Sequence, residues 1–190
     1  MLGVDPGLSR CGVGMVSGSV QRPVMVWVGV VRTPPNRPVP ERLAQVHAEL
    51  TTLLSDLRPD AVAVERVLFN SNARTAMGVG QAAGVVLLCA AQAGVETIEY
   101  TPTQVKATVT GSGTAGKDQV AYMVKAQLRL TEAPSPADAA DALALALCHL
   151  QRGGGATTSG AMSPRLAAAL AAARVGAQVV RPGSRPGGMS

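Results

Sequence analysis

Charged side chains are scarce in this chain of 190 residues. They make up 15% of the sequence against about 25% in an average soluble protein, and apolar residues make up 47%. Low charge combined with high apolar content excludes a wholly disordered chain. A chain of this length buries about 70% of its unfolded surface on folding, so we expect a single packed domain.

Long apolar runs are also missing. The longest run worth testing, 82–91, is well short of the roughly 18 to 20 residues that a membrane-spanning helix needs. The first residues lack the basic stretch, apolar region and cleavage site of a secretory signal. We therefore expect a cytoplasmic protein without a transmembrane helix.

Cysteine and histidine are too few and too scattered for a disulfide framework or a zinc site. The three cysteines, Cys11, Cys89 and Cys148, lie far apart and show no Cys-x-x-Cys spacing. The two histidines, His47 and His149, are equally isolated, whereas zinc requires a set of soft or imidazole ligands. We expect buried, reduced thiols and no zinc.

The net charge of +5 lies entirely in the last part of the chain. Residues 1–151 contain 12 basic and 12 acidic groups, and the five remaining arginines all follow position 151. We expect a globular domain at 1–151 and a Gly-, Pro- and Arg-rich tail at 152–190, flexible except for one possible short helix at 163–175. The tail could attract phosphates or merely keep the protein in solution, and the sequence leaves both interpretations open.

The order of apolar patterns predicts an α/β fold. Three short apolar runs separated by turn residues come first and favour antiparallel strands, and strands then alternate with helical patterns. The expected strands are 1–4, 11–16, 24–31, 61–64 and 95–100, and the expected helices are 40–57, 72–92, 103–109, 118–130 and 135–150. A mixed sheet with helices packed on it accounts for this order.

The predicted helix 72–92 is almost uniformly apolar or small, with little solvated face. Either it crosses the centre of the domain, or it packs against its own copy across a two-fold axis. Gly80 and Gly84 would allow close backbone approach in such a pair, and this favours a homodimer.

Four acids stand at positions where the apolar pattern predicts burial. Asp138 and Asp141 lie one turn apart on one face of an otherwise apolar helix, and Asp5 and Glu65 end two apolar strands. Ser135 could cap the helix, and Asp138 in its first turn could interact favourably with the helix dipole. Asp141 lies too far along the helix for such an interaction. Four converging carboxylates would bind a pair of hard divalent cations, as in phosphodiester-cleaving enzymes.

At these residues the sequence resembles the RuvC family of Holliday junction resolvases, within the ribonuclease H-like superfamily. The resemblance covers residues 1 to about 151, and its blocks occur in the family's order and spacing. The matching blocks are GVDPG at 3–7, VERV at 64–67, GQA at 80–82, QVK at 104–106, TGSG at 110–113, KDQV at 117–120 and ADAADALALA at 137–146.

The resemblance implies a ribonuclease H-like five-stranded mixed sheet with helices on both faces, and a homodimer that cuts four-way DNA junctions. Its catalytic, metal-binding acids would be Asp5, Glu65, Asp138 and Asp141. Two Mg2+ per subunit, replaceable by Mn2+, would activate water and stabilise the departing 3′ oxygen. The products would be symmetric nicks with 5′-phosphate and 3′-hydroxyl ends, and the branch-migration proteins RuvA and RuvB are the implied partners.

The resemblance also suggests residues that contact DNA. Lys106 and Lys117 match family lysines near the scissile phosphate, where an ammonium stabilises negative charge. The family commonly has an aromatic three residues after the central Glu, but here Leu68 takes that position and Phe69 follows it, so Phe69 is the candidate for base stacking. Asn72 and Arg74 complete the predicted DNA-binding set.

Three other classes of protein deserve comparison. The run from Gly111 to Lys117 imitates a phosphate-binding loop, but Asp118 replaces the Ser or Thr that holds magnesium, which disfavours an ATPase. A kinase of the actin type would need a second domain of this kind. A non-catalytic DNA-binding protein of the same fold would lack one or more of the four acids, and all are present.

Overall fold

The computed structural model describes residues 1–67 and 73–153. They form one five-stranded sheet in the order β3-β2-β1-β4-β5. The strands are β1 (Leu2–Asp5), β2 (Arg10–Ser19), β3 (Arg22–Arg32), β4 (Ala61–Glu65) and β5 (Glu96–Tyr100). The helices are α1 (Val39–Leu57), α2 (Ala73–Gln92), α3 (Pro102–Thr110), α4 (Lys117–Gln127) and α5 (Ala137–Gln151).

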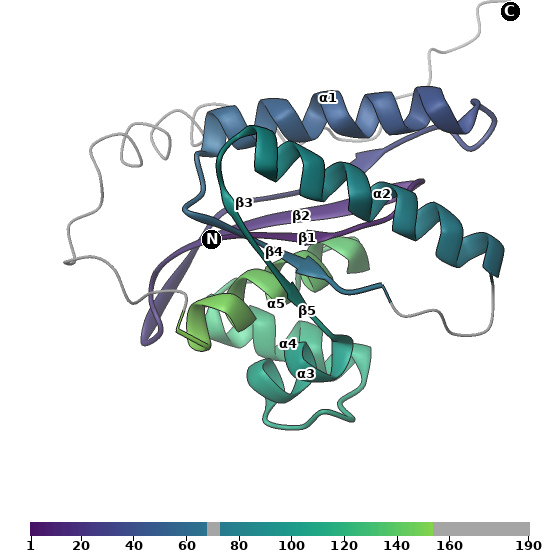
Figure 1. Ribbon diagram of the computed structural model, residues 1–190. Coiled ribbons are helices and arrows are strands. Elements are labelled where there is room, and N and C mark those ends of the chain that lie inside the picture. The colour runs from purple at the N-terminus through teal and green to yellow at the C-terminus, as the bar shows by residue number, and fades with distance from the viewer. Residues whose placement is uncertain (68–72, 154–190) are drawn as a thin grey trace, which may run out of the picture.

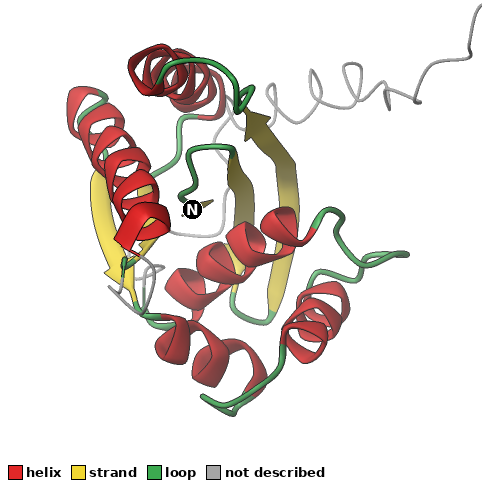
Figure 2. Ribbon diagram, turned by 90° about the vertical axis from the view of Figure 1, so that its right-hand side faces the viewer, coloured by secondary structure: helices red, strands yellow, loops and turns green. Residues whose placement is uncertain are grey.

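The sheet lies between two layers of helices (Figure 1). Helices α1 and α2 cover one face, and α3, α4 and α5 cover the other (Figures 1 and 2). Strands β1 to β3 pair antiparallel, whereas β1 with β4 and β4 with β5 pair parallel. The expected mixed sheet with three antiparallel first strands and helices on both faces is confirmed.

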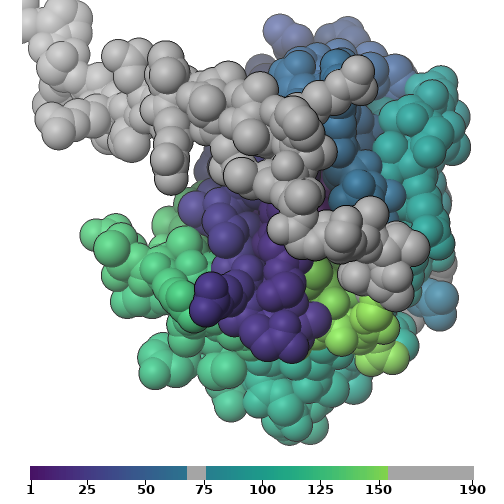
Figure 3. Space-filling view, turned by 90° about the vertical axis from the view of Figure 1, so that its left-hand side faces the viewer, coloured from purple at the N-terminus to yellow at the C-terminus, as the bar shows by residue number. Residues whose placement is uncertain are grey.

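Successive side chains of β1 point alternately to the two helical layers. Leu2 and Val4 are buried in the core under α1 and α2, together with residues such as Val46 and Leu50. Gly3 and Asp5 therefore face α5, because successive side chains of a strand point to opposite faces of the sheet. Seen from the side where β2 turns into β3, the amino-terminal strands lie between α1 and α5 (Figure 3).

Helix α5 packs unusually close to the sheet because three strand residues facing it are glycines. A Cβ atom added to Gly3 would lie 2.0 Å from the carbonyl oxygen of Ala142, and one added to Gly12 would lie 2.0 Å from that of Asp138. A Cβ on Gly14 would meet the side chain of Leu143 at 2.9 Å. Only glycine fits this contact, so these residues fix the height of α5 above β1 and β2.

Most boundaries differ from expectation by one or two residues, and three differences have a clear physical reason. The β2–β3 hairpin is longer than the two predicted strands, because its turn uses only the residues between Ser19 and Arg22. Helix α4 ends at Gln127 rather than at residue 130, since Leu128 caps it and Arg129 has a positive φ of 53°. The capping role expected of Ser135 is wrong: Pro136 occupies the N-cap position of α5, without a side-chain hydrogen bond.

Two expectations fall on residues that the structure does not describe. Asn72, the first residue of the helix expected at 72–92, lies outside the described residues. The tail from residue 154 to 190, with the short helix expected at 163–175, lies outside them as well.

A substitution of Gly3 tests the close contact of α5. Gly3→Ala should lower the free energy of unfolding by roughly 1–3 kcal/mol, because its new methyl group meets helix backbone that cannot rotate away. Urea denaturation measures this change. Gly116→Ala is the matched control, since an added Cβ there meets nothing within 4 Å; an equal loss of stability in both variants would contradict the packing argument.

Candidate active site

Asp5 and Glu65 lie side by side at the ends of two neighbouring parallel strands. The register pairs Val4 of β1 with Val64 of β4, and each strand ends at the next residue. Each carboxyl group shifts the pKa of the other, so the two side chains lie close together. Topology therefore brings together two acids that are 60 positions apart in the sequence.

Asp138 and Asp141 approach this pair from α5. The register pairs Asp5 with Gly12, and the backbone of Asp138 rests directly on Gly12. Asp141 lies one turn further along, and its side chain is 29% exposed on a helix whose neighbouring residues are buried. The close glycine contact thus places the first turns of α5 beside the ends of β1 and β4.

The charges at this point act on one another. Burial is the largest cause that raises the pKa of Asp5 to about 8, followed by the negative charges of Glu65 and Asp141 and, more weakly, of Asp138. All four acids therefore lie within electrostatic reach of one point. Burial also raises the pKa of Glu65, with a further contribution from Asp141. Such a site holds more negative charge than its surroundings neutralise.

Cationic side chains surround the acids. Lys117 Nζ lies 3.3 Å from Asp141 Oδ2, and the charge of Asp141 raises the pKa of this lysine. Lys106 and Lys117 each favour the ionised form of Glu65 and so partly oppose the rise of its pKa. Both predicted lysines therefore lie near the acids, Lys117 in direct contact and Lys106 within electrostatic range.

Arg10 is a site residue that the sequence analysis missed. Its Nε donates a hydrogen bond of 2.7 Å to Asp138 Oδ2, and the two side chains form an ion pair. A signal was present, because Arg10 and Gly12 are two residues apart in β2 and share a face with Asp5. Placing Arg10 there required the β1–β2 register, which the sequence pattern alone does not fix.

The residues present fit a divalent cation. Every candidate ligand is a carboxylate oxygen, the donor that Mg2+ and Mn2+ prefer, and burial of like charges leaves them in need of a cation. Within residues 1–67 and 73–153, no three acid, histidine or cysteine side chains form a ready-made ligand set. Asp138 forms an ion pair with Arg10, and Asp141 forms one with Lys117. Before these two acids can bind a metal ion, the basic side chains have to move away from them.

The predicted DNA-binding residues are described only in part. Phe69 and Asn72 lie outside the described residues, as does Leu68. Arg74 lies in the first turn of α2, where the structure describes the backbone alone. Their contact with DNA stays a prediction.

The three cysteines are buried, as expected. All three cysteines are free and buried. His149 Nδ1 lies 2.9 Å from the hydroxyl oxygen of Tyr100 in a buried hydrogen bond on the far part of α5. No helix within the described part of the chain is long and apolar enough to cross a membrane.

A five-stranded mixed sheet in this order, with acids at the ends of β1 and β4 and on a helix laid across them, defines a ribonuclease H-like protein with an acidic site. The family model of the crossover junction endodeoxyribonuclease RuvC matches residues 1–149. The chain therefore belongs to the RuvC family.

Individual relatives agree with this assignment. The chain is 54% identical over 177 residues to the crossover junction endodeoxyribonuclease RuvC of Salinispora arenicola, covering 93% of this chain and 97% of that one. It is 56% identical over 154 residues to the RuvC of Frankia casuarinae, covering 80% and 90% respectively. The structure of T. thermophilus RuvC in complex with Holliday junction substrate matches with a TM-score of 0.77 and 41% identity, over 80% of this chain and 93% of that one.

A more distant structure shares the fold alone. The yeast mitochondrial Holliday junction resolvase Ydc2 matches with a TM-score of 0.56 at 14% identity, over 92% of this chain and 82% of that one.

Removing one buried acid should stabilise the metal-free protein. Asp5→Asn keeps the shape of the side chain but eliminates a charge that burial and Glu65 oppose. The folded pKa of Asp5, about 8, lies above the ordinary 3.8, so its stabilising contribution is present at low pH and is lost as pH rises from about 4 to about 8. The variant should therefore gain on the order of a few kcal/mol relative to wild type across this window.

Thermal and urea unfolding in chelator at pH 5 and pH 9 measure the effect. Glu132→Gln removes an exposed acid on a different part of the surface and should leave the difference between the two pH values unchanged. A wild type and Asp5→Asn variant of equal stability at pH 9 would show that Asp5 carries no electrostatic strain.

Proposed function

We propose that this chain is a Holliday junction resolvase, an endonuclease that cuts four-way DNA junctions by paired, symmetric phosphodiester hydrolysis in recombination and repair. The observation that carries the proposal is that Glu65, Asp141 and Asp138 all act electrostatically on Asp5 within a RuvC-family fold. The products are 5′-phosphate and 3′-hydroxyl ends. The relative from T. thermophilus, whose structure holds a Holliday junction, supports this choice of substrate.

The four acids are the proposed ligands of two Mg2+, with Mn2+ as a substitute. When bound, the ions would supply a more acidic water as nucleophile and stabilise negative charge on the departing 3′ oxygen. Asp5 and Glu65 stand adjacent on the rigid ends of two buried strands, so they form the fixed side of the site. Asp138 and Asp141 complete it from α5.

The basic side chains have roles that follow from their present partners. Lys117 is 77% exposed and holds Asp141 through a single contact, so its ammonium can turn to a phosphate oxygen when Asp141 binds metal. Lys106 stands near Glu65 and can stabilise charge on the scissile phosphate in the same way. The contact of Lys117 with Asp141 also disfavours the phosphate-binding-loop interpretation, because a carboxylate stands where a nucleotide phosphate would bind.

Symmetric cutting requires two active sites, and α2 offers a surface for a homodimer. Its outward face carries Met77, 63% exposed, and Leu88, 50% exposed. Between them, an added Cβ on Gly80 or Gly84 would meet nothing within 4 Å, so the helix backbone is open to a partner. An exposed stripe of apolar and small residues is a typical interface for a second copy of the same helix.

The cellular setting follows from the family. We place the protein in the cytoplasm, where it meets chromosomal junctions, and propose RuvA and RuvB as the proteins that deliver the branch point. The basic tail at 152–190 is proposed as a separate segment beyond the nuclease domain, whose boundary at 151 agrees with the end of α5.

Cutting of a synthetic four-way junction tests the function. The wild type should nick two opposite strands symmetrically in Mg2+ or Mn2+ and leave linear duplex largely intact. Asp141→Asn should slow cutting at least about a hundredfold, since losing several kcal/mol of transition-state stabilisation costs more than two factors of ten. Gel analysis of end-labelled strands measures both results.

Junction binding separates chemistry from recognition in the same experiment. Asp141→Asn should bind the junction as wild type does in gel shift without metal, and Asp118→Asn should cut normally because Asp118 lies outside the acid cluster. Normal cutting by Asp141→Asn would remove Asp141 from the site.

A charge on the outward face of α2 tests the homodimer. Leu88→Asp should shift the chain from dimer to monomer, because two buried carboxylates would face each other across the axis. Light scattering after size-exclusion chromatography gives the mass. Tyr122→Asp, at a 67% exposed position of α4, is the control and should remain dimeric; a dimeric Leu88→Asp would place the interface elsewhere.

A further inference from the structure

Arg42 is a buried arginine whose hydrogen-bond partners in the described part of the chain are neutral hydroxyl groups. It lies in the first turns of α1 and is only 8% exposed. Its Nε donates a hydrogen bond of 2.9 Å to Thr33 Oγ1, and one of its terminal nitrogens donates one of 2.6 Å to Ser9 Oγ. Within the part of the chain that the structure describes, no carboxylate forms an ion pair with it.

This placement works against the stability of the fold in two ways. A buried charge normally needs an opposite charge or a metal, and here the guanidinium has only neutral hydroxyl groups. A cation near the amino end of a helix is also unfavourable, because that end carries the positive pole of the helix dipole. Burying an uncharged side chain at this position would cost less free energy. Arg42 is therefore not explained by a need to fill space in the core.

Thr33 connects Arg42 to the backbone of the loop after β1 through hydrogen bonds. Its hydroxyl accepts from Arg42 and donates a hydrogen bond of 2.6 Å to the carbonyl oxygen of Leu8. The backbone N–H of Thr33 donates to the carbonyl oxygen of Ser9 at 3.2 Å. Thr33 is 4% exposed, so this Arg42 cluster, consisting of Arg42, Thr33 and Ser9, is held in place by packing as well as hydrogen bonds.

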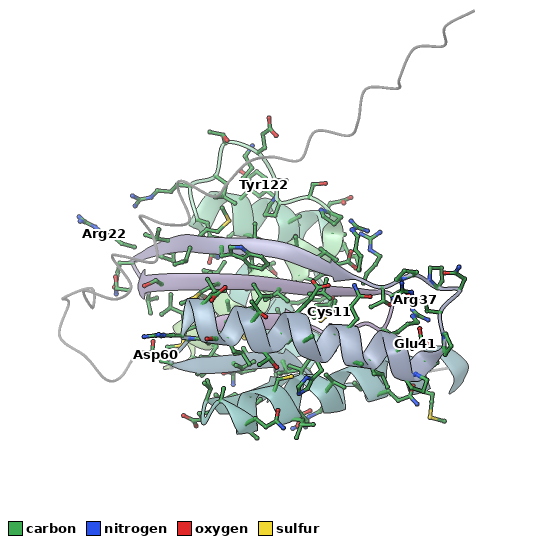
Figure 4. The ribbon with its side chains drawn as sticks, turned by 90° about the horizontal axis from the view of Figure 1, so that it is seen from above. Cys11, Arg22, Arg37, Glu41, Asp60 and Tyr122 are labelled. Carbon is green, nitrogen blue, oxygen red and sulfur yellow. The ribbon has the colours of Figure 1, made fainter. Side chains whose placement is uncertain are left out.

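The Arg42 cluster is hydrogen-bonded to the loop between β1 and β2, which connects two residues of the site. Residues 6–9 connect Asp5, at the end of β1, with Arg10, at the start of β2. Asp5 faces Glu65, and Arg10 pairs with Asp138, so a shift of the loop moves one group at each side of the acid cluster. Figure 4 shows the first turn of α1, marked by Glu41, at this end of the sheet and far from the β2–β3 turn, marked by Arg22.

A restraint of this kind is needed here. Asp5 and Glu65 are adjacent acids in a buried setting, and their ionised forms repel each other. The short loop after Asp5 is the part of the chain that would give way, because β1 itself is held between two paired strands. A guanidinium that donates from two nitrogens to two different residues resists such a movement in more than one direction.

We infer that the Arg42 cluster positions the loop 6–9, and through it Asp5 and Arg10, for metal binding and phosphodiester cleavage. Arg42 and Thr33 are positioning residues, since neither touches the acids. This inference rests on the proposed nuclease function, and it adds a group 37 positions after Asp5 on a different element.

Four variants test it in the full-length chain. Thr33→Val removes the hydroxyl at constant shape, and Thr33→Ser restores it. Arg42→Lys keeps the charge but loses the two-nitrogen geometry. Val46→Ala is the stability control, because it removes a 0% exposed side chain one turn further along α1, away from the loop.

Thr33→Val and Arg42→Lys should each cut the junction about tenfold or more slowly in single turnover, and bind Mg2+ about tenfold more weakly by isothermal titration calorimetry. Their affinity for the junction without metal should stay within about twofold of wild type. Thr33→Ser should approach wild type, and Val46→Ala, despite an equal or larger fall in melting temperature, should keep its cutting rate and Mg2+ affinity.

Two results would overturn the inference: unchanged Mg2+ affinity in Thr33→Val and Arg42→Lys, or losses in Val46→Ala as large as theirs at the same loss of stability. Failure of the proposed function has a different signature. A wild type that binds Mg2+ but cuts no junction would refute the resolvase, while the Mg2+ affinities of the variants would still decide the role of the cluster.

Discussion

The close contact between α5 and the first two strands is the constraint on which the site depends. Gly3, Gly12 and Gly14 let the helix backbone touch the strand backbone, and no other residue would permit this distance. The contact fixes the height at which Asp138 and Asp141 stand relative to the ends of β1 and β4. Packing and chemistry are therefore set by the same three glycines.

In the site, the acids repel one another, and two of them are paired with basic side chains. Burial and, after it, the neighbouring negative charges raise the pKa values of Asp5 and Glu65, while Arg10 and Lys117 each pair with one of the acids on α5. The exposed lysine is free to exchange partners, whereas the backbone around Arg10 is tied down by the Arg42 cluster. The site thus has two halves. The acids on the strands are held in fixed positions, whereas the acids on α5 have basic partners that can be exchanged.

Much of this arrangement could be predicted from the sequence because its key residues break a pattern. An acid deep in an apolar helix has few structural explanations, and this pointed to Asp141. Asp5 and Glu65, each unremarkable alone at the end of an apolar strand, gained their weight from the set of four acids. The sheet and its antiparallel first strands followed from turn residues and apolar periods. The family resemblance supplied Lys106 and Lys117, which spacing alone would have left as ordinary surface lysines.

The parts that escaped prediction depend on long-range register. Arg10 and Arg42 look like common charged residues until β1–β2 pairing and the start of α1 place them. Ser135 was predicted to cap α5, but Pro136 takes the cap position and the helix begins at Ala137. Local sequence carries no information on which hydroxyl groups a distant guanidinium will meet.

The order of the elements along the chain has a consequence for biosynthesis. Asp5 and Glu65 emerge early from the ribosome, whereas α5, which bears Asp138 and Asp141, is the last helix of the described domain. A nascent polypeptide that ends before α5 also lacks the helix that covers Gly3 and Gly12. A polypeptide shortened before α5 therefore carries only two of the four clustered acids, on a sheet face that is left uncovered.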